Sequence, residues 1–194
     1  MARNVEIKAW IESVEALAPV AAALADQGPT EIAQDDTFFT CPHGRLKLRA
    51  FSATSGQLIF YQRPDQAGPK ESFFLISPTA SPDTLREALT LAYGQAGRVR
   101  KQRTLYLAGR TRIHLDRVEN LGDFLELEVA MAEGEPAGAG EAVAYDLLAK
   151  FGIAPNQFIE RAYVDLLNAG GRTTSAMPPR SKSDRRFRRA DTRP

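Results

Sequence analysis

Basic and acidic side chains occur at every second position in several segments of this sequence. Residues 45–49 place three basic side chains on one face, Lys101 and Arg103 do the same further along, and Glu126 and Glu128 form an acidic counterpart. Side chains two residues apart on a β-strand point to the same side. Because cations complement phosphate oxygens and carboxylates bind hard divalent ions, the pattern indicates a site for a metal-bound polyphosphate.

Two further segments carry mixed polar and charged faces, one made of Asn4, Glu6 and Lys8 and the other of Arg112, His114 and Asp116. For any one strand, a solvated outer face is the commoner explanation of such alternation. Here the opposite faces are apolar, and the sequence supplies helices that could cover them and turn the ionic faces inward. Ions held in a dry interior cost several kcal/mol each, so we expect a wet interior that holds a polyanion.

The elements that must position these side chains are mostly strands. Alternating polar and apolar residues predict strands at 3–11, 34–40, 45–51, 57–63, 71–77, 99–108, 111–118 and 124–131. Apolar residues at helical spacing predict helices at 14–26, 82–93 and 141–151, and a shorter helix near 157–167. Short turns between most strands favour antiparallel pairing. We therefore expect an α+β fold, an eight-stranded antiparallel closed β-tunnel with helices packed outside.

The chain divides into two parts by composition. Residues 1–171 are predicted to form the tunnel domain, and residues 172–194, with eight basic residues against two aspartates, a disordered basic tail. The single cysteine, Cys41, excludes an internal disulfide. No apolar run reaches the roughly 20 residues that a bilayer span needs, and charged residues interrupt the first ten positions. We therefore expect a cytoplasmic protein with no membrane partner.

Seven short motifs, in order along the chain, carry a resemblance to a known family. They are Asn4–Lys8, Gln34–Phe39, Gly44–Arg49, Tyr61–Pro64, Lys101–Arg103, Ile113–Asp116 and Gly122–Glu128. Through them the sequence resembles, over residues 1–168, the CYTH superfamily of triphosphate-tunnel enzymes, which includes class IV adenylyl cyclases and thiamine or inorganic triphosphatases. The segment 36–70 is most similar to bacterial proteins labelled class IV adenylyl cyclase.

The resemblance implies roles for particular residues. The metal ions, Mg²⁺ or Mn²⁺, would be held by Glu6, Glu126 and Glu128. The phosphates would be held by the cations Lys47, Arg49, Arg63, Lys101, Arg103 and Arg112. The catalytic residues would be Glu6, Lys8 and Asp116. Two histidines form no catalytic constellation by themselves, so His114 is expected only to form hydrogen bonds inside the tunnel.

One position departs from the family's opening signature, Glu-x-Glu-x-Lys, because Asn4 stands where the first glutamate is found. An amide oxygen carries no charge, so a metal ion would be held more weakly there. The resemblance implies an enzyme, a metal-dependent cyclase that converts ATP to cyclic AMP and pyrophosphate. An inorganic or thiamine triphosphatase and a non-catalytic triphosphate-binding or nucleotide-binding protein are the alternatives, since all of them need the same clamp.

The expected partner is a nucleoside triphosphate or another triphosphate. Nucleic acid is not expected, because the basic tail alone could hold it and that tail has one aromatic residue, Phe187. A tunnel of this kind could also pair through an outer face as a homodimer.

Overall fold

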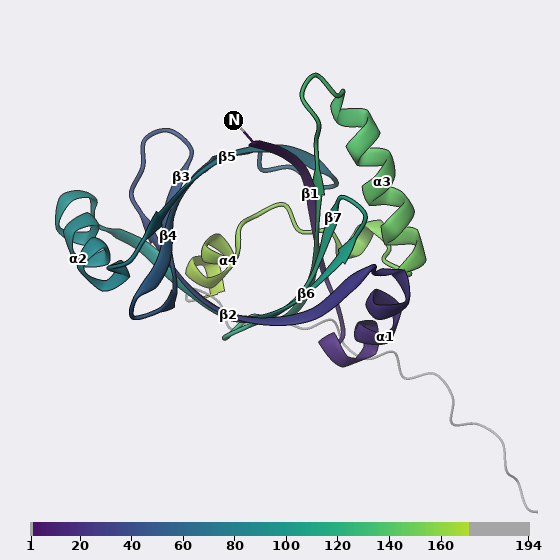
Figure 1. Cartoon of the computed structure of the whole chain (residues 1–194), viewed down its shortest axis with the longest axis horizontal. Helices are drawn as coiled ribbons and strands as arrows, with labels where there is room; N and C mark the ends of the chain where they lie inside the picture. The colour runs from purple at the N-terminus through teal and green to yellow at the C-terminus, as the bar shows by residue number, and fades with distance from the viewer. Residues whose placement is uncertain (1, 171–194) are drawn as a thin grey trace, which may run out of the picture.

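The computed structural model describes residues 2–170, and the predicted basic tail lies outside them. Within this range eight strands pair antiparallel and close into a barrel in the order β1-β5-β4-β3-β2-β6-β7-β8. Figure 1 looks down the opening of this barrel. The predicted closed tunnel is confirmed. The strands are β1 (Ala2–Trp10), β2 (Gln27–Phe39), β3 (Arg45–Ser52), β4 (Ser55–Gln62), β5 (Lys70–Thr79), β6 (Gln95–Ala108), β7 (Thr111–Val118) and β8 (Gly122–Ala130).

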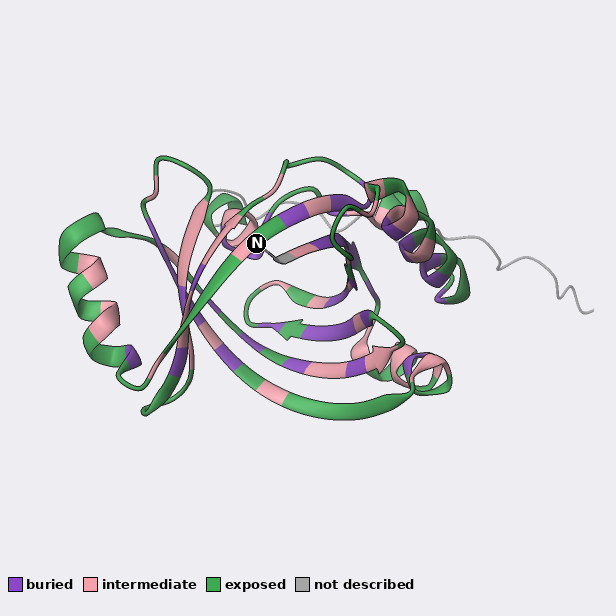
Figure 2. Ribbon diagram, turned by 45° about the horizontal axis from the view of Figure 1, so that its top comes forward, coloured by how far each residue is buried: buried purple, intermediate pink, exposed green. Residues whose placement is uncertain are grey.

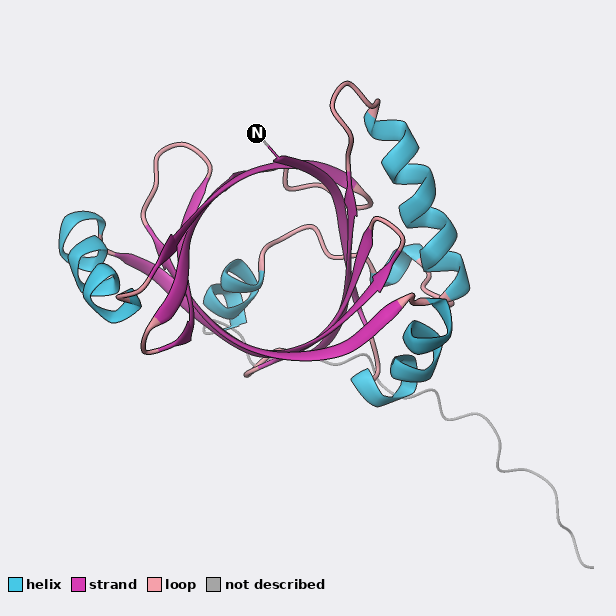
Figure 3. Cartoon of the chain, in the orientation of Figure 1, coloured by secondary structure: helices cyan, strands magenta, loops and turns pink. Residues whose placement is uncertain are grey.

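The described residues also form four α-helices, α1 (Val14–Leu24), α2 (Pro82–Tyr93), α3 (Ala137–Lys150) and α4 (Tyr163–Gly170). Ser13 caps the N-terminus of α1, where its hydroxyl accepts a hydrogen bond from the Ala16 backbone N–H at 3.1 Å. The helices α1 and α3 lie on one outer side of the barrel and α2 on the opposite side, while α4 lies across part of one end (Figures 1 and 3). None of the helices in the described part of the chain is long and apolar enough to cross a membrane.

The main apolar core lies outside the barrel, between its wall and the helices α1 and α3. The outward side chains of β1, β7 and β8 pack there against α3 residues such as Leu147 and Leu148, and Figure 2 shows buried positions along the strands. Each fully buried aliphatic side chain stabilises the fold by about 1.5–3 kcal/mol. With the apolar faces covered from outside, the alternate faces of the same strands point into the barrel. The wall-forming apolar residues are Val5, Ile7, Ile113, Leu115, Leu125, Leu127 and Val129.

A smaller apolar cluster, which includes Val99, Phe124, Tyr163 and Val164, closes one end of the barrel. The segment before α4 reaches this end through a bridge between Ala9 and Phe158, and the Ile159 N–H donates to the Lys8 carbonyl at 2.9 Å. The predicted helix near 157–167 is therefore wrong in its first half, where the chain instead runs beside β1. The conformation of this segment depends on its contacts with β1 at the end of the barrel. The local periodicity of the sequence carries no information about those contacts.

Several elements begin earlier than the sequence predicts, as β6 does at Gln95 in place of 99, and the early starts of β2 and α3 have a clear physical reason. β2 begins at Gln27. Its first residues are exposed, and backbone pairing with β6, not burial, holds them in the strand. Without alternating burial, that half of the strand leaves no period-two signal. α3 begins at Ala137, ahead of the predicted 141, and includes Gly140. A Cβ there would lie 2.8 Å from Val5 Cγ2, so glycine lets the helix approach β1 closely.

Candidate functional site

Alternate residues of all eight strands face the inside of the barrel and line a cavity of about 460 Å³. Among the sequence-predicted site residues, all but Asp116 line this cavity. The central expectation, that ionic side chains from different strands converge inside the tunnel, therefore holds, while their individual roles stay predictions. The cavity's cations are Lys8, Lys47, Arg49, Arg63, Lys101, Arg103 and Arg112, and its carboxylates are Glu6, Asp36, Glu126 and Glu128.

Glu126, on β8, is a meeting point of the charged network. The Lys8 ammonium lies 2.8 Å from Glu126 Oε1, and Arg103 Nη2 donates to Glu126 Oε2 at 2.5 Å. Burial alone would raise the pKa of the Glu126 carboxyl, but the charges of Lys8 and Arg103 outweigh it and hold that pKa well below its usual range. Glu126 is therefore an ionised oxygen donor inside the tunnel, which is the form that binds a divalent cation.

Lys101 and Arg103 are held in place by a buried aspartate on the neighbouring strand. Asp116 accepts from Lys101 at 2.6 Å and from two nitrogens of Arg103 at 2.6 and 2.7 Å, and the Tyr163 hydroxyl adds a bond at 3.1 Å. Burial and the neighbouring Arg103 charge lower the pKa of Lys101 to about 8. Asp116 has no exposed surface and lies behind these cations. Its predicted catalytic role stays a prediction.

Lys47 and Arg49, on β3, share a carboxylate that the sequence analysis did not single out. Asp36, on β2, accepts from Lys47 at 2.8 Å and from two nitrogens of Arg49 at 2.7 and 2.8 Å. The positions pair because Asp36 lies opposite Arg49 in the ladder. These bonds hold the two cations in fixed positions beside the cavity. The Asp36 carboxylate also cancels one of their two positive charges. Its signal in the sequence was only that Asp36 falls on the inward face of β2.

The Asp36 fork predicts a loss of stability in acid. Burial opposes the Asp36 charge, but Arg49 and Lys47 outweigh it, so folding lowers the pKa of Asp36. A lowered pKa contributes stability above the unfolded value, about 3.9, and that contribution is lost as the pH falls below about 5. Urea unfolding at several values between pH 7 and pH 3 should show a shallower pH dependence in Asp36→Asn than in the wild type. Parallel curves for the two proteins would contradict this assignment.

Glu6 and Arg63 form a third contact within the cavity. Arg63 Nε lies 3.1 Å from Glu6 Oε1. Burial raises the pKa of the Glu6 carboxyl, and the nearby charges of Glu126 and Glu128 add to the rise. Repulsion among three acidic groups inside one cavity is the situation that a bound divalent cation would relieve. Glu6 also lies opposite Glu128 in the β1–β8 ladder, so the predicted metal-binding carboxylates come from neighbouring positions.

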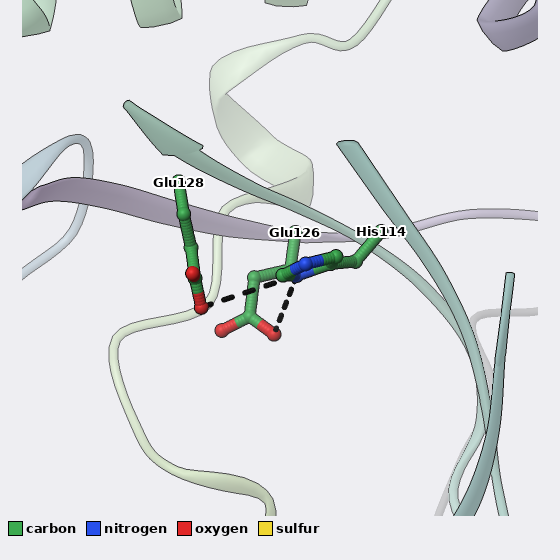
Figure 4. Close-up of side chains that lie close together, drawn as sticks. All are labelled: His114, Glu126 and Glu128. Carbon is green, nitrogen blue, oxygen red and sulfur yellow. Dashed lines mark ion pairs between the residues drawn. The ribbon is translucent and has the colours of Figure 1, made fainter. Parts of the chain in front are cut away.

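Among the described residues, the side chains grouped closely enough to hold a metal ion are His114, Glu126 and Glu128, whose ligand atoms all lie within 4.8 Å of one another (Figure 4). His114 Nδ1 and Asn4 Oδ1 are both buried and have no hydrogen-bond partner within residues 2–170. Burial lowers the pKa of His114, which favours the neutral imidazole. Carboxylates and a neutral imidazole are both ligands of divalent metal ions, so the residues present suit a divalent ion.

Tyr163 is a further site residue that sequence reasoning missed. Its ring lies 4.8 Å from the Lys8 ammonium and 5.0 Å from that of Lys101, and its hydroxyl donates to Asp116. Cation–π contacts of this kind stabilise buried ammonium groups by about 1–2 kcal/mol. No local sequence pattern predicts that Tyr163 contacts these ammonium groups, because α4 reaches the cavity only by folding back over the barrel end.

A protein-family model described as the CYTH domain matches residues 2–163. The chain belongs to the CYTH family. The family that the motifs indicate is thereby confirmed. Among solved structures, the CYTH fold of this chain is similar to the PH1012 protein from Pyrococcus horikoshii OT3. That protein is 22% identical, with 84% of this chain and 98% of that chain covered and a TM-score of 0.75.

Two other solved structures similar to this CYTH chain carry functional descriptions of their own. A candidate adenylate cyclase from Vibrio parahaemolyticus is 19% identical, covers 85% of this chain and 97% of its own, and has a TM-score of 0.69. The candidate adenylyl cyclase HpAC1 from Hippeastrum is 15% identical, covers 88% and 96%, and has a TM-score of 0.60. At these identities the likeness concerns the CYTH fold alone. No curated protein matches the chain.

Proposed function

We propose that this CYTH protein is an enzyme that binds a nucleoside triphosphate with Mg²⁺ or Mn²⁺ in its tunnel and converts ATP to cyclic AMP and pyrophosphate. The observation that carries the proposal is the convergence of seven cations on one cavity that also holds the Glu126 and Glu128 carboxylates. Cations alone would suit any polyanion, whereas cations beside a group of ionised carboxylates suit a metal–triphosphate. The cavity's cations also exceed its four lining carboxylates and buried Asp116 by two, which favours an anionic substrate.

The rest of the cavity wall supports an organic triphosphate. Apolar side chains from four strands line the same cavity as the ionic ones, namely Ile32, Ile59, Phe74, Ile76 and Leu105. An inorganic polyphosphate has nothing to place against such a surface. A nucleoside would bury its base there, and apolar contact contributes about 25 cal/mol for each Å² removed from water. Phe74 could stack on that base.

The protein's own groups would divide the work in the following way. Lys47 and Arg49, fixed by Asp36, would hold phosphate oxygens in one orientation, and Lys101 and Arg103 would neutralise charge that develops as the phosphoryl bond breaks. A divalent ion near Glu126 and Glu128 would add Lewis-acid stabilisation of that charge. Enclosure by the barrel keeps these charges partly desolvated, which strengthens their action on the substrate.

Hydrolysis of a triphosphate is the second candidate, because it needs the same clamp and differs only in the nucleophile. HpAC1, which shares the fold, is described as having a dominant triphosphatase activity. In the cyclase reaction the ribose hydroxyl attacks the α-phosphate, whereas in hydrolysis water attacks the terminal phosphate. The side of the cavity on which the base binds would decide between them. The cytoplasmic location and the homodimer stay predictions.

Incubation with ATP, tripolyphosphate or thiamine triphosphate, with each product scored separately, tests the proposal. With Mn²⁺ or Mg²⁺ and ATP, we expect cyclic AMP and pyrophosphate in equal amounts and no product in chelator. ADP and phosphate, or phosphate from tripolyphosphate, would support the hydrolytic candidate instead. Tight triphosphate binding by calorimetry without any product would contradict an enzymatic function.

A further inference from the structure

His114 is the one nitrogen donor of the candidate metal group. It lies on β7 opposite Glu126 in the β7–β8 ladder, and its side chain turns into the cavity beside Glu126 and Glu128 (Figure 4). Only 3% of the residue is exposed, and Nδ1 has no hydrogen-bond partner in the part of the chain that the structure describes. A buried nitrogen left unpaired costs free energy, about 1–3 kcal/mol, and calls for a missing partner.

The distances around Nδ1 fit an ion better than they fit a hydrogen bond. Nδ1 lies 3.8 Å from Glu126 Oε2 and 3.9 Å from Glu128 Oε1. Hydrogen bonds between nitrogen and oxygen span about 2.7–3.2 Å. Two atoms that each lie about 2.1 Å from one metal ion are at most about 4.2 Å apart. Both separations fall within that limit, so one ion could be shared between His114 and either carboxylate once the ligands draw together and Glu126 Oε2 loosens its 2.5 Å bond from Arg103.

The other ring nitrogen must change its contact for this role. Nε2 lies 3.4 Å from Arg103 Nη1, and because arginine can only donate, this long contact places the proton of the neutral ring on Nδ1. When Nδ1 gives its lone pair to a metal ion, the proton of the neutral ring sits on Nε2, and this contact must lengthen. Arg103 keeps its two bonds to Asp116, so the loss to the arginine is small.

We propose that His114 binds the metal ion through Nδ1 together with Glu126 and Glu128, and that this mixed set makes the tunnel select a transition-metal ion such as Mn²⁺ or Co²⁺ over Mg²⁺. Mg²⁺ prefers oxygen ligands and gives up its waters reluctantly, whereas imidazole nitrogen suits first-row transition metals. Asn4, which also lines the cavity, offers a neutral oxygen in place of another charge. The inference concerns the metal of the proposed function, and it can be tested without substrate.

The direct test is pulsed EPR of the full chain loaded with Mn²⁺. A nitrogen bound to the ion produces echo modulation from ¹⁴N, and labelling histidine with ¹⁵N should change it. His43, in an exposed loop, is the only other histidine, so His43→Gln is a matched control that should keep the signal. His114→Gln should abolish it. An unmodulated signal from the wild type would overturn the proposal whatever the variants do.

Calorimetric titration gives the selectivity. We expect the wild type to bind Mn²⁺ more tightly than Mg²⁺, and the ratio of the two affinities to fall about tenfold in His114→Asp, which makes the donor set all oxygen. His43→Asp should leave the ratio unchanged. An unchanged ratio in His114→Asp would contradict the proposal, even if the protein proved to be an active enzyme. Conversely, nitrogen coupling in a protein that turns over no triphosphate would overturn the proposed function alone.

Discussion

Replacing Glu126 with glutamine should lower metal-dependent turnover about a thousand-fold, because Lewis-acid stabilisation is worth several kcal/mol and each 1.4 kcal/mol is about tenfold in rate. Glutamine keeps the shape of the side chain and removes the charge that would hold the ion. Steady-state kinetics with Mn²⁺ and ATP, scored for each product, provides the measurement. Unchanged product formation would remove Glu126 from the metal site.

The same substitution should leave binding of the bare triphosphate at least as tight as in the wild type. Glu126 neutralises Lys8 and Arg103, which lie 2.8 and 2.5 Å from its oxygens. Without the carboxylate charge, both cations are free to attract phosphate. Calorimetry with tripolyphosphate in chelator therefore separates a lost metal ligand from a collapsed tunnel, since a collapsed tunnel would lose both properties. Glu133→Gln, on an exposed loop, is the matched control and should change neither.

The tunnel could be predicted because two independent patterns agreed. Period-two alternation gives the strands, and the apolar residues on the opposite faces, such as Ile7 and Leu127, need helices to cover them. Once those faces are covered from outside, the ionic faces can only point inward. The start of β2 gave no such signal, because its first five residues are all exposed and backbone pairing to β6 orders them.

The site could be predicted as a set of inward residues but not as a set of contacts. Asp36 and His114 were both on inward faces, yet nothing local shows that one pairs with two cations and that the other stands free beside two carboxylates. Those relations follow from the register between neighbouring strands, where Asp36 meets Arg49 and His114 meets Glu126. In these two hairpins the register depends on the turn geometry together with the buried pattern, and neither motif alone specifies it.

Asp116→Asn should destabilise the fold by about 3–5 kcal/mol, the usual cost of breaking a buried ion pair from one side. Asp116 is fully buried and receives Lys101 and two nitrogens of Arg103 within 2.7 Å. An amide offers one acceptor oxygen and turns its NH₂ toward those donors, so it leaves buried charge unpaired. For a domain of this size, the melting temperature should fall by on the order of 10 °C.

A surface ion pair of similar length on α3 provides the control for Asp116→Asn. Asp146 and Lys150 lie 2.7 Å apart on α3, but their side chains are 63% and 50% exposed. Water already solvates both charges, so Asp146→Asn should cost less than about 0.5 kcal/mol. If both variants have melting temperatures near that of the wild type, Asp116 does not stabilise the fold. Lys101 and Arg103 must then be held by the cavity's other charges. If only Asp116→Asn melts early, Lys101 and Arg103 owe their positions to a carboxylate outside the cavity lining.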